Sequence, residues 1–243
     1  MTATEDSAMA KCFRTWTVLE HEPVEKLSDK IWSVSGTLPK GSTKRLMAVV
    51  KLSGERLLVH NAIALEDSEM AELERWGKPA VMIVPNGFHR QDAYIWKQRY
   101  PELVVLCPEG ARAKVEEEVP VSGSYDHDLG DPSVQLFHWR GSKNREGGVL
   151  VREADRSTLI VNDMLLNLPK LGGMMGVMLG PTGVASVPRV MRWMLVKDMA
   201  ALKQHLLEVA RTPGLGRILV GHGENIEGPS AGTSLESAAA RLS

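Results

Sequence analysis

Short apolar runs, separated by charged segments, dominate the first half of the chain. The segments Leu46–Leu52 and Arg56–Ala62 are rich in apolar and β-branched residues, and the turn Ser53–Glu55 joins them. This pattern predicts a β-hairpin. In the next segment, Glu69–Trp76, apolar residues recur at helical spacing, which predicts an amphipathic helix.

The stretch Lys78–Trp96 organises this half of the chain. An apolar run, Ala80–Val84, predicts a buried strand. The polar loop Phe88–Asp92 follows it, and a second helix is expected over Ala93–Arg99. In α/β proteins the loop that follows such a strand is where binding and catalytic residues are usually found.

The second half of the chain repeats this order of elements. Strands are expected at Val134–Trp139, Gly148–Glu153 and Ser157–Asn162. Asp198 is a suitable N-cap for a strongly amphipathic helix, and Arg217–Val220 has the pattern of a last buried strand.

Each half therefore begins with antiparallel hairpins and continues with alternating helices and strands. A doubly wound parallel sheet would not begin in this way. The pattern predicts an α/β (α+β) protein in which two mixed sheets pack face to face and helices cover their outer faces.

Polar residues follow three of the predicted strands. His89 and Asp92 follow the first of these strands, Asp163 follows Ser157–Asn162, and His222 follows Arg217–Val220. Brought to one sheet edge, these side chains would form a metal-type site, because imidazole and carboxylate groups are the usual nitrogen and oxygen ligands of zinc.

Each of these residues also has a structural interpretation. An aspartate at a strand end is often a turn or capping residue. A histidine between two glycines, such as His222, can hydrogen-bond to the backbone instead of binding an ion. The metal site is therefore a hypothesis that depends on the three strand ends meeting.

Composition excludes several classes of function. The 243 residues carry a net charge of −1, which gives no overall support for binding nucleic acid or a membrane. Two cysteines, Cys12 and Cys107, do not make a disulfide framework, so a reducing cytoplasm is expected. The polar N-terminus lacks the apolar core of a signal peptide, and residues 1–11 are expected to be disordered.

Two motifs in the second half resemble a known family. Thr158–Asp163 reads Thr-Leu-Ile-Val-Asn-Asp, and Ile218–Gly223 reads Ile-Leu-Val-Gly-His-Gly. Together with the order of elements, they resemble the metallo-β-lactamase fold superfamily, and more narrowly a bacterial branch with reduced metal motifs. The resemblance implies a four-layer αββα sandwich in a single domain, residues 12–226, followed by a tail, residues 227–243. It also implies that Asp163 and His222 match metal ligands at one sheet edge.

The chain departs from the family in its other metal motifs. The family has H-x-H-x-D-H after a strand, whereas Asn86–Asp92 contains one histidine, His89, and one aspartate. Ser142 stands where the family has a further ligand histidine. The resemblance therefore implies at most one ion, held by Asp163, His222 and either His89 or Asp92.

Two functions compete at this point. The first is a hydrolase with a mononuclear zinc, iron or manganese site, which acts on an ester, thioester or lactone while Asp92 or Asp163 orients the attacking water. The second is a metal-free, non-catalytic member of the fold that binds a small molecule or a protein partner. Neither involves nucleic acid or a membrane, and the fold allows a homodimer.

The Gly/Met-rich segment 172–180 has no clear period. Methionine side chains are flexible, and surfaces rich in them often contact partners or apolar ligands. The other interpretation is an irregular loop packed on the core.

Overall fold

The computed structural model describes residues 12–39 and 44–242, so the expected disorder of residues 1–11 lies outside the described residues. The chain divides into two compact units. Unit 1 consists of Met1–Cys107 and Ala111–Ser124, and unit 2 consists of Pro108–Gly110 and Tyr125–Ser243. Each unit has its own sheet and its own hydrophobic core.

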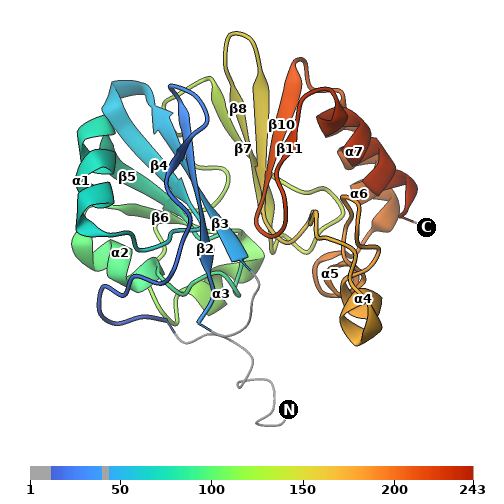
Figure 1. Cartoon of the computed structure of the whole chain (residues 1–243), viewed down its shortest axis with the longest axis horizontal. Helices are drawn as coiled ribbons and strands as arrows, with labels where there is room; N and C mark the ends of the chain where they lie inside the picture. Colours follow the sequence, from blue (N-terminus) through green and yellow to red (C-terminus); the bar gives the residue numbers. More distant parts are fainter. Residues whose placement is uncertain (1–11, 40–43, 243) are drawn as a thin grey trace. The chain divides into compact units, whose positions relative to one another are not determined.

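Unit 1 is built on a six-stranded mixed sheet with the order β1-β2-β3-β4-β5-β6 (Figure 1). Its strands are β1 (Glu25–Lys26), β2 (Ile31–Thr37), β3 (Lys44–Leu52), β4 (Arg56–His60), β5 (Lys78–Ile83) and β6 (Val104–Leu106). The first four strands are antiparallel neighbours, and β4, β5 and β6 run parallel. Pairing of Val50 with Leu58 confirms the predicted hairpin. Its turn contains a short 3-10 helix, Ser53–Glu55.

The helices of unit 1 are α1 (Asp67–Trp76), α2 (Ala93–Arg99) and α3 (Arg112–Val115). Met70 and Leu73 of α1 are buried, and Trp76 stacks on Trp32 of β2 with ring centroids 4.1 Å apart. The core beneath α2 includes Trp96, which is fully buried. In Figure 1, α1 and α2 lie along one face of the sheet.

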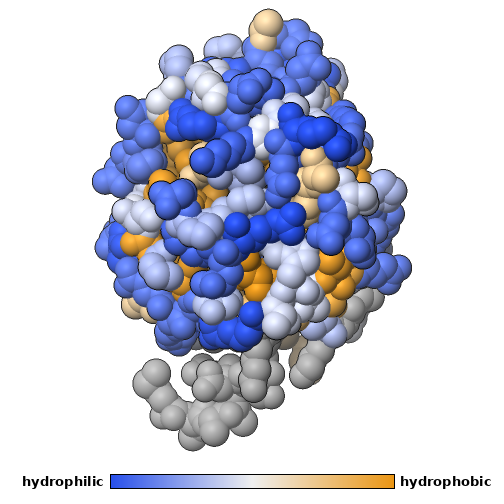
Figure 2. Space-filling model, turned by 90° about the vertical axis from the view of Figure 1, so that its left-hand side faces the viewer, coloured by the Kyte–Doolittle hydropathy of each residue, from blue (hydrophilic) through white to orange (hydrophobic). Residues whose placement is uncertain are grey.

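The outer surface of unit 1 contrasts with this core. Figure 2 shows that hydrophilic residues cover most of that face, and that apolar residues appear only as small separate areas between them. This is the normal surface of a water-exposed helical layer.

Unit 2 is built on a five-stranded mixed sheet with the order β11-β10-β9-β8-β7. Its strands are β7 (Val134–His138), β8 (Gly147–Arg152), β9 (Ser157–Val161), β10 (Leu215–Val220) and β11 (Ile226–Glu227). Only β9 and β10 run parallel, and the other neighbours are antiparallel. A 3-10 helix, Glu109–Ala111, precedes α3 in the chain.

The helices of unit 2 are α4 (Gly173–Leu179), α5 (Arg189–Leu195), α6 (Met199–Ala210) and α7 (Ser230–Ala240). Asp198 caps α6 as predicted, because its Oδ1 accepts a hydrogen bond from the Ala201 N–H at 3.0 Å. Leu202 and Leu206 are buried on the inner face of α6. The predicted helical spacing therefore identified the packed face correctly.

Residues from Glu227 onward, which the sequence set apart as a tail, contain α7. Ala231, Leu235, Ala238 and Ala239 of this helix are buried in the core of unit 2. The structure also decides between the two interpretations of the segment 172–180 as a loop packed on the core or as a contact surface in one respect, its packing. The segment forms α4, which has no buried residue, so the interpretation as a loop packed on the core is wrong.

Two mixed sheets with helices confirm the predicted fold class. Within the part of the chain that the structure describes, the helices are all too short or too polar to cross a bilayer.

Candidate metal centre

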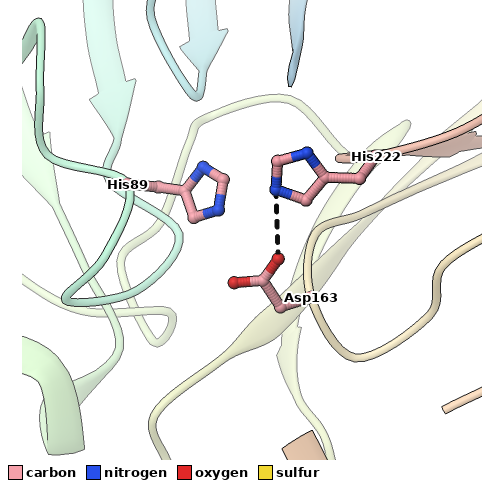
Figure 3. A group of neighbouring side chains, drawn as sticks. All are labelled: His89, Asp163 and His222. Atoms are coloured by element: carbon pink, nitrogen blue, oxygen red, sulfur yellow. Dashed lines mark ion pairs between the residues drawn. The ribbon is translucent and has the colours of Figure 1, made fainter. Parts of the chain in front are cut away.

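Asp163 and His222 lie at equivalent positions after two parallel strands of unit 2. Val161 of β9 and Val220 of β10 are partners in the strand register, and Asp163 and His222 each follow the last residue of their strand by two positions. Parallel neighbours end at the same edge of a sheet, so equal offsets bring the two side chains together. His222 Nε2 lies 3.4 Å from Asp163 Oδ1. Figure 3 marks this contact with a dashed line.

Two glycines shape the turn that presents His222. A Cβ on Gly221 would lie 2.3 Å from Asn162 Oδ1, and a Cβ on Gly223 would lie 2.2 Å from the Asn167 carbonyl oxygen. Gly223 also has a φ of 98°, a conformation that residues with a side chain rarely adopt. The two glycines flanking His222 are therefore required by close packing and by backbone conformation.

Glu146 holds the loop that carries Asp163. This residue lies directly before β8 and is fully buried. Its Oε2 accepts a hydrogen bond from the Asp163 N–H at 3.0 Å, and its Oε1 accepts one from the Met164 N–H at 2.6 Å. A carboxylate that accepts two backbone N–H groups fixes the turn after β9 firmly.

Sequence reasoning missed Glu146. It lies between Arg145 and Gly147 in a polar loop, where an acidic residue is normally exposed. Its partners are 17 and 18 residues away in the chain, so no local pattern indicates its role.

The donor set of unit 2 fits a divalent ion. A tetrahedral ion with ligands at about 2.0–2.2 Å separates neighbouring donor atoms by about 3.3–3.6 Å. The observed 3.4 Å between Asp163 Oδ1 and His222 Nε2 falls in this range. The same distance is compatible with a direct ion pair when the imidazole is protonated. Both side chains are mostly buried, so either arrangement is partly shielded from water.

His89 is presented by unit 1, in the loop after β5. Asn86 Oδ1 accepts hydrogen bonds from the N–H groups of Phe88 and His89, at 2.9 and 3.2 Å, which makes a local turn. Figure 3 draws this residue together with the other two predicted ligands, and marks the interaction between Asp163 and His222.

Asn61 determines which nitrogen of His89 carries a proton. Asn61 Nδ2 donates to the Leu46 carbonyl oxygen at 2.8 Å, so its Oδ1 is the atom 3.2 Å from His89 Nδ1. Oδ1 can only accept, so His89 Nδ1 must donate. The neutral ring then has its lone pair on Nε2, the form that a metal ligand or a proton acceptor needs.

His60, the residue before Asn61, is fully buried at the end of β4. Burial, with a smaller contribution from the neighbouring His89, lowers the pKa of its imidazole to about 3. His60 is therefore neutral at ordinary pH and leaves the environment of His89 without an added positive charge.

Asp92, predicted as a catalytic residue, makes two internal contacts in unit 1. Its Oδ1 accepts a hydrogen bond from the Ala64 N–H at 3.0 Å, and its Oδ2 pairs with Arg45 Nη2. Burial raises the pKa of the Asp92 carboxyl, while the Arg45 guanidinium opposes this shift. Arg45 Nη1 also donates to the Ala62 carbonyl oxygen. This buried pair joins the start of α2 to β3, and both of its members hydrogen-bond to the loop after β4.

Ser142, which occupies the place of a family histidine in the resemblance, is a turn residue. It is buried, and its Oγ accepts a hydrogen bond from the Asn144 N–H at 3.1 Å. The structure thus brings Asp163 and His222 together in unit 2, and places His89 and Asp92 in different surroundings in unit 1.

Solved structures similar to this chain are metallo-β-lactamases. The DIM-1 metallo-β-lactamase aligns with a TM-score of 0.64 and 14% identity, over 93% of this chain and 100% of that chain. A metallo-β-lactamase from Pontibacter korlensis gives 0.61 and 12%, over 91% and 100%. FIM-1 from Pseudomonas aeruginosa, in its mono-zinc form, gives 0.61 and 11%, over 92% and 96%.

No protein-family model matches the sequence, and neither does any curated protein. The structural likeness shows that the chain has the metallo-β-lactamase fold, which confirms the resemblance at the level of fold. The resemblance to one bacterial branch stays a prediction.

Proposed function

We propose that this protein is a metal-dependent hydrolase with a mononuclear site formed by Asp163, His222 and His89. The observation that carries the proposal is the 3.4 Å approach of Asp163 Oδ1 to His222 Nε2, at matched ends of two parallel strands, in a chain with the metallo-β-lactamase fold. His89 is the proposed third ligand, through Nε2, because its hydrogen bond to Asn61 leaves the lone pair there.

Three protein ligands are the usual number in a catalytic zinc site, and a fourth position then remains for water. When bound, a divalent ion supplies Lewis acidity and lowers the pKa of bound water toward neutrality. The mono-zinc form of FIM-1 is a precedent within the fold for a site with one ion.

The chain's own residues would position the water and transfer its proton. The Asp163 carboxylate orients the attacking water and accepts its proton, and Glu146 keeps that carboxylate in place through the loop backbone. The proposed substrates are esters, thioesters or lactones. Water attacks the carbonyl carbon, the bond from that carbon to the ester oxygen or thioester sulfur breaks, and the departing atom takes up the proton that Asp163 accepted. We do not extend the predicted catalytic role to Asp92, because Ala64 and Arg45 engage its two oxygens.

A second candidate function is a metal-free binding protein. The observation that favours it is the same Asp163–His222 contact, which a protonated imidazole could make directly without an ion. In that case the pair would hold two loop ends together, and the protein would bind a small molecule or a protein partner without hydrolysing it.

Metal content and hydrolysis together distinguish the two functions. Untagged wild-type protein is incubated with zinc, iron or manganese, freed of excess ion and analysed for metals. It is then assayed on ester, thioester and lactone substrates. We expect about one ion per chain, lost in Asp163→Asn, His222→Ala and His89→Ala.

The exposed residues Asp155 and His127 provide matched controls, and Asp155→Asn and His127→Ala should keep the ion. Circular dichroism checks that all the variants are folded. Wild-type protein that takes up no ion would overturn the hydrolase proposal in favour of the metal-free one. Bound ion without hydrolysis of any substrate would leave the metal site standing and overturn the proposed reaction.

A further inference from the structure

Exposed apolar side chains are concentrated on one part of unit 2. Seven large apolar residues are exposed in the described part of the chain, and six of them lie between residues 174 and 193. They are Met174, Met175, Val177, Met178, Val184 and Trp193, and we name them the Met/Trp surface. Met174 is 77% exposed and Trp193 is 81% exposed, so these side chains project from the unit and do not line a groove.

The two helices that carry the Met/Trp surface are held in a fixed relation. Arg189 Nη1 of α5 donates to the Val177 carbonyl oxygen of α4 at 2.9 Å. A bridge between Leu166 and Ser186 closes the base of the segment. In Figure 1, α4 lies at the periphery of unit 2 beside α5. The apolar residues therefore belong to an ordered, protruding element.

The segment Met164–Lys197, which carries the Met/Trp surface, has charges of one sign, and the exposed Asp198 follows it. From Met164 to Lys197 the sequence contains no acidic residue, whereas it contains Lys170, Arg189, Arg192 and Lys197. Lys170, Arg189 and Lys197 are exposed. Lys143, from the loop before β8, adds a further cation, since its Nζ donates to the Trp193 carbonyl oxygen at 3.0 Å.

We propose that the Met/Trp surface docks on an anionic lipid bilayer. A convex apolar element with a largely exposed tryptophan suits the boundary between lipid head groups and acyl chains, because the bilayer deforms around it. The surrounding cations are complementary to lipid phosphates. A second copy of the chain is a poor occupant, because a symmetric contact would place these cations against one another.

This inference departs from the expectation of no membrane partner, which rested on the whole-chain charge of −1. The whole-chain charge does not reveal the local excess of positive charge, because acidic residues elsewhere in the chain cancel it. The inference uses no residue of the proposed metal site and does not depend on hydrolysis.

Vesicle binding tests the proposal. The full chain is mixed with vesicles of phosphatidylcholine alone, or of phosphatidylcholine with about 30% phosphatidylglycerol, and sedimented. We expect binding to the anionic vesicles that is at least about tenfold tighter than to the neutral ones and that weakens at about 0.5 M salt. Trp193 is the only exposed tryptophan of the six, so quenching of fluorescence by brominated lipids would report its insertion.

A pair of double variants separates the Met/Trp surface from net charge. Met174→Glu with Met178→Glu should reduce binding to anionic vesicles about tenfold or more. Gln204→Glu with Ser237→Glu adds the same charge at exposed positions of α6 and α7, and should change binding less than about twofold.

Three results would overturn the proposal. The first is wild-type protein that binds neither kind of vesicle, which would favour a protein partner. The second is an equal loss of binding in the two double variants. The third is a dimer, detected by analytical ultracentrifugation, that Met174→Glu with Met178→Glu dissociates, since the surface would then be an interface between copies.

Discussion

The parallel strands β9 and β10 of unit 2 and the parallel strands β4 and β5 of unit 1 present their polar residues in different ways. In unit 2, Asp163 and His222 each follow a register partner by two residues, and their side chains meet directly. In unit 1, His60 and Ile83 are register partners, but Asn61 follows by one residue and His89 by six. The longer loop needs Asn86 and Asn61 to hold His89.

The difference teaches what a short loop contributes. When two parallel strands end at matched positions, the strand register brings the residues that follow close together, and in unit 2 one buried carboxylate, Glu146, fixes the turn. When a loop of several residues intervenes, side-chain hydrogen bonds have to supply the same precision. The predictions test this contrast by changing residues that hold the loops and residues that would perform chemistry.

The largest loss of unfolding free energy is expected on substitution of Asp92. Asp92→Leu would leave Arg45 buried without its carboxylate, which costs about 3–5 kcal/mol of unfolding free energy. Asp163→Asn should cost less than about 1 kcal/mol, because it leaves the Asp163 N–H bond to Glu146 intact. Urea unfolding of both variants measures the two free energies. Equal losses would remove the distinction between a structural and a functional aspartate.

The next effect is a pH dependence that His60 confers. The folded pKa of about 3 lies below the usual value of 6.5, so the unfolded chain binds more protons between these values. This contribution to stability is fully present above pH 6.5 and decreases by about 1.4 kcal/mol per pH unit as the pH falls toward 3.

His60→Leu removes the titrating group and should flatten that decline. Urea unfolding of wild type and variant at several pH values between 7 and about 4.5 provides the test. A variant whose stability falls as steeply as that of the wild type would show that His60 is not the buried neutral base of unit 1.

A smaller loss is expected at Glu146. Glu146→Gln replaces one accepting carboxylate oxygen with an amide nitrogen, which cannot accept a hydrogen bond from the backbone. The free energy of unfolding should fall by about 1–3 kcal/mol. The loop that carries Asp163 should loosen, and metal affinity should fall with it. The exposed Glu236 offers the control variant Glu236→Gln, which should behave like wild type. Unchanged stability in Glu146→Gln would show that the carboxylate does not hold this loop.

The smallest effect on stability is expected for Asn61→Asp, one of two variants that test the tautomer of His89. Asn61→Asp keeps the accepting oxygen toward His89 Nδ1 but loses the donation to Leu46, a cost of about 1 kcal/mol. Asn61→Leu loses both bonds and should weaken zinc binding at least about tenfold. Calorimetric titration compares the two variants, and equal affinities would deny Asn61 this role.

Much of the fold was predictable from the sequence, because local patterns carried it. The hairpin Leu46–Ala62 and the α6 helix capped by Asp198 follow from periodicity and capping alone. The Ala/Ser-rich helix α7 was harder to place, since its small side chains give little contrast between the buried and exposed faces.

The candidate site was predictable only in part, for a physical reason. Asp163 and His222 stand out because each directly follows an apolar strand. Glu146 and Asn61 act through partners that are 15 to 28 residues away, and the sequence carries no sign of those contacts. Asp92 has the residue type of a catalytic group, and the sequence carries no sign of its buried contact with Arg45.

The central claim is that His89 joins Asp163 and His222 in one ligand set. Nitrogen-15 NMR of the seven histidines during a zinc titration tests it most directly. The account predicts that the Nε2 signals of His89 and His222 shift together and saturate at about one equivalent, while the other five histidines keep their signals. A zinc titration that shifts the signals of His222 but not those of His89, or that shifts the signals of neither residue, would contradict the claim.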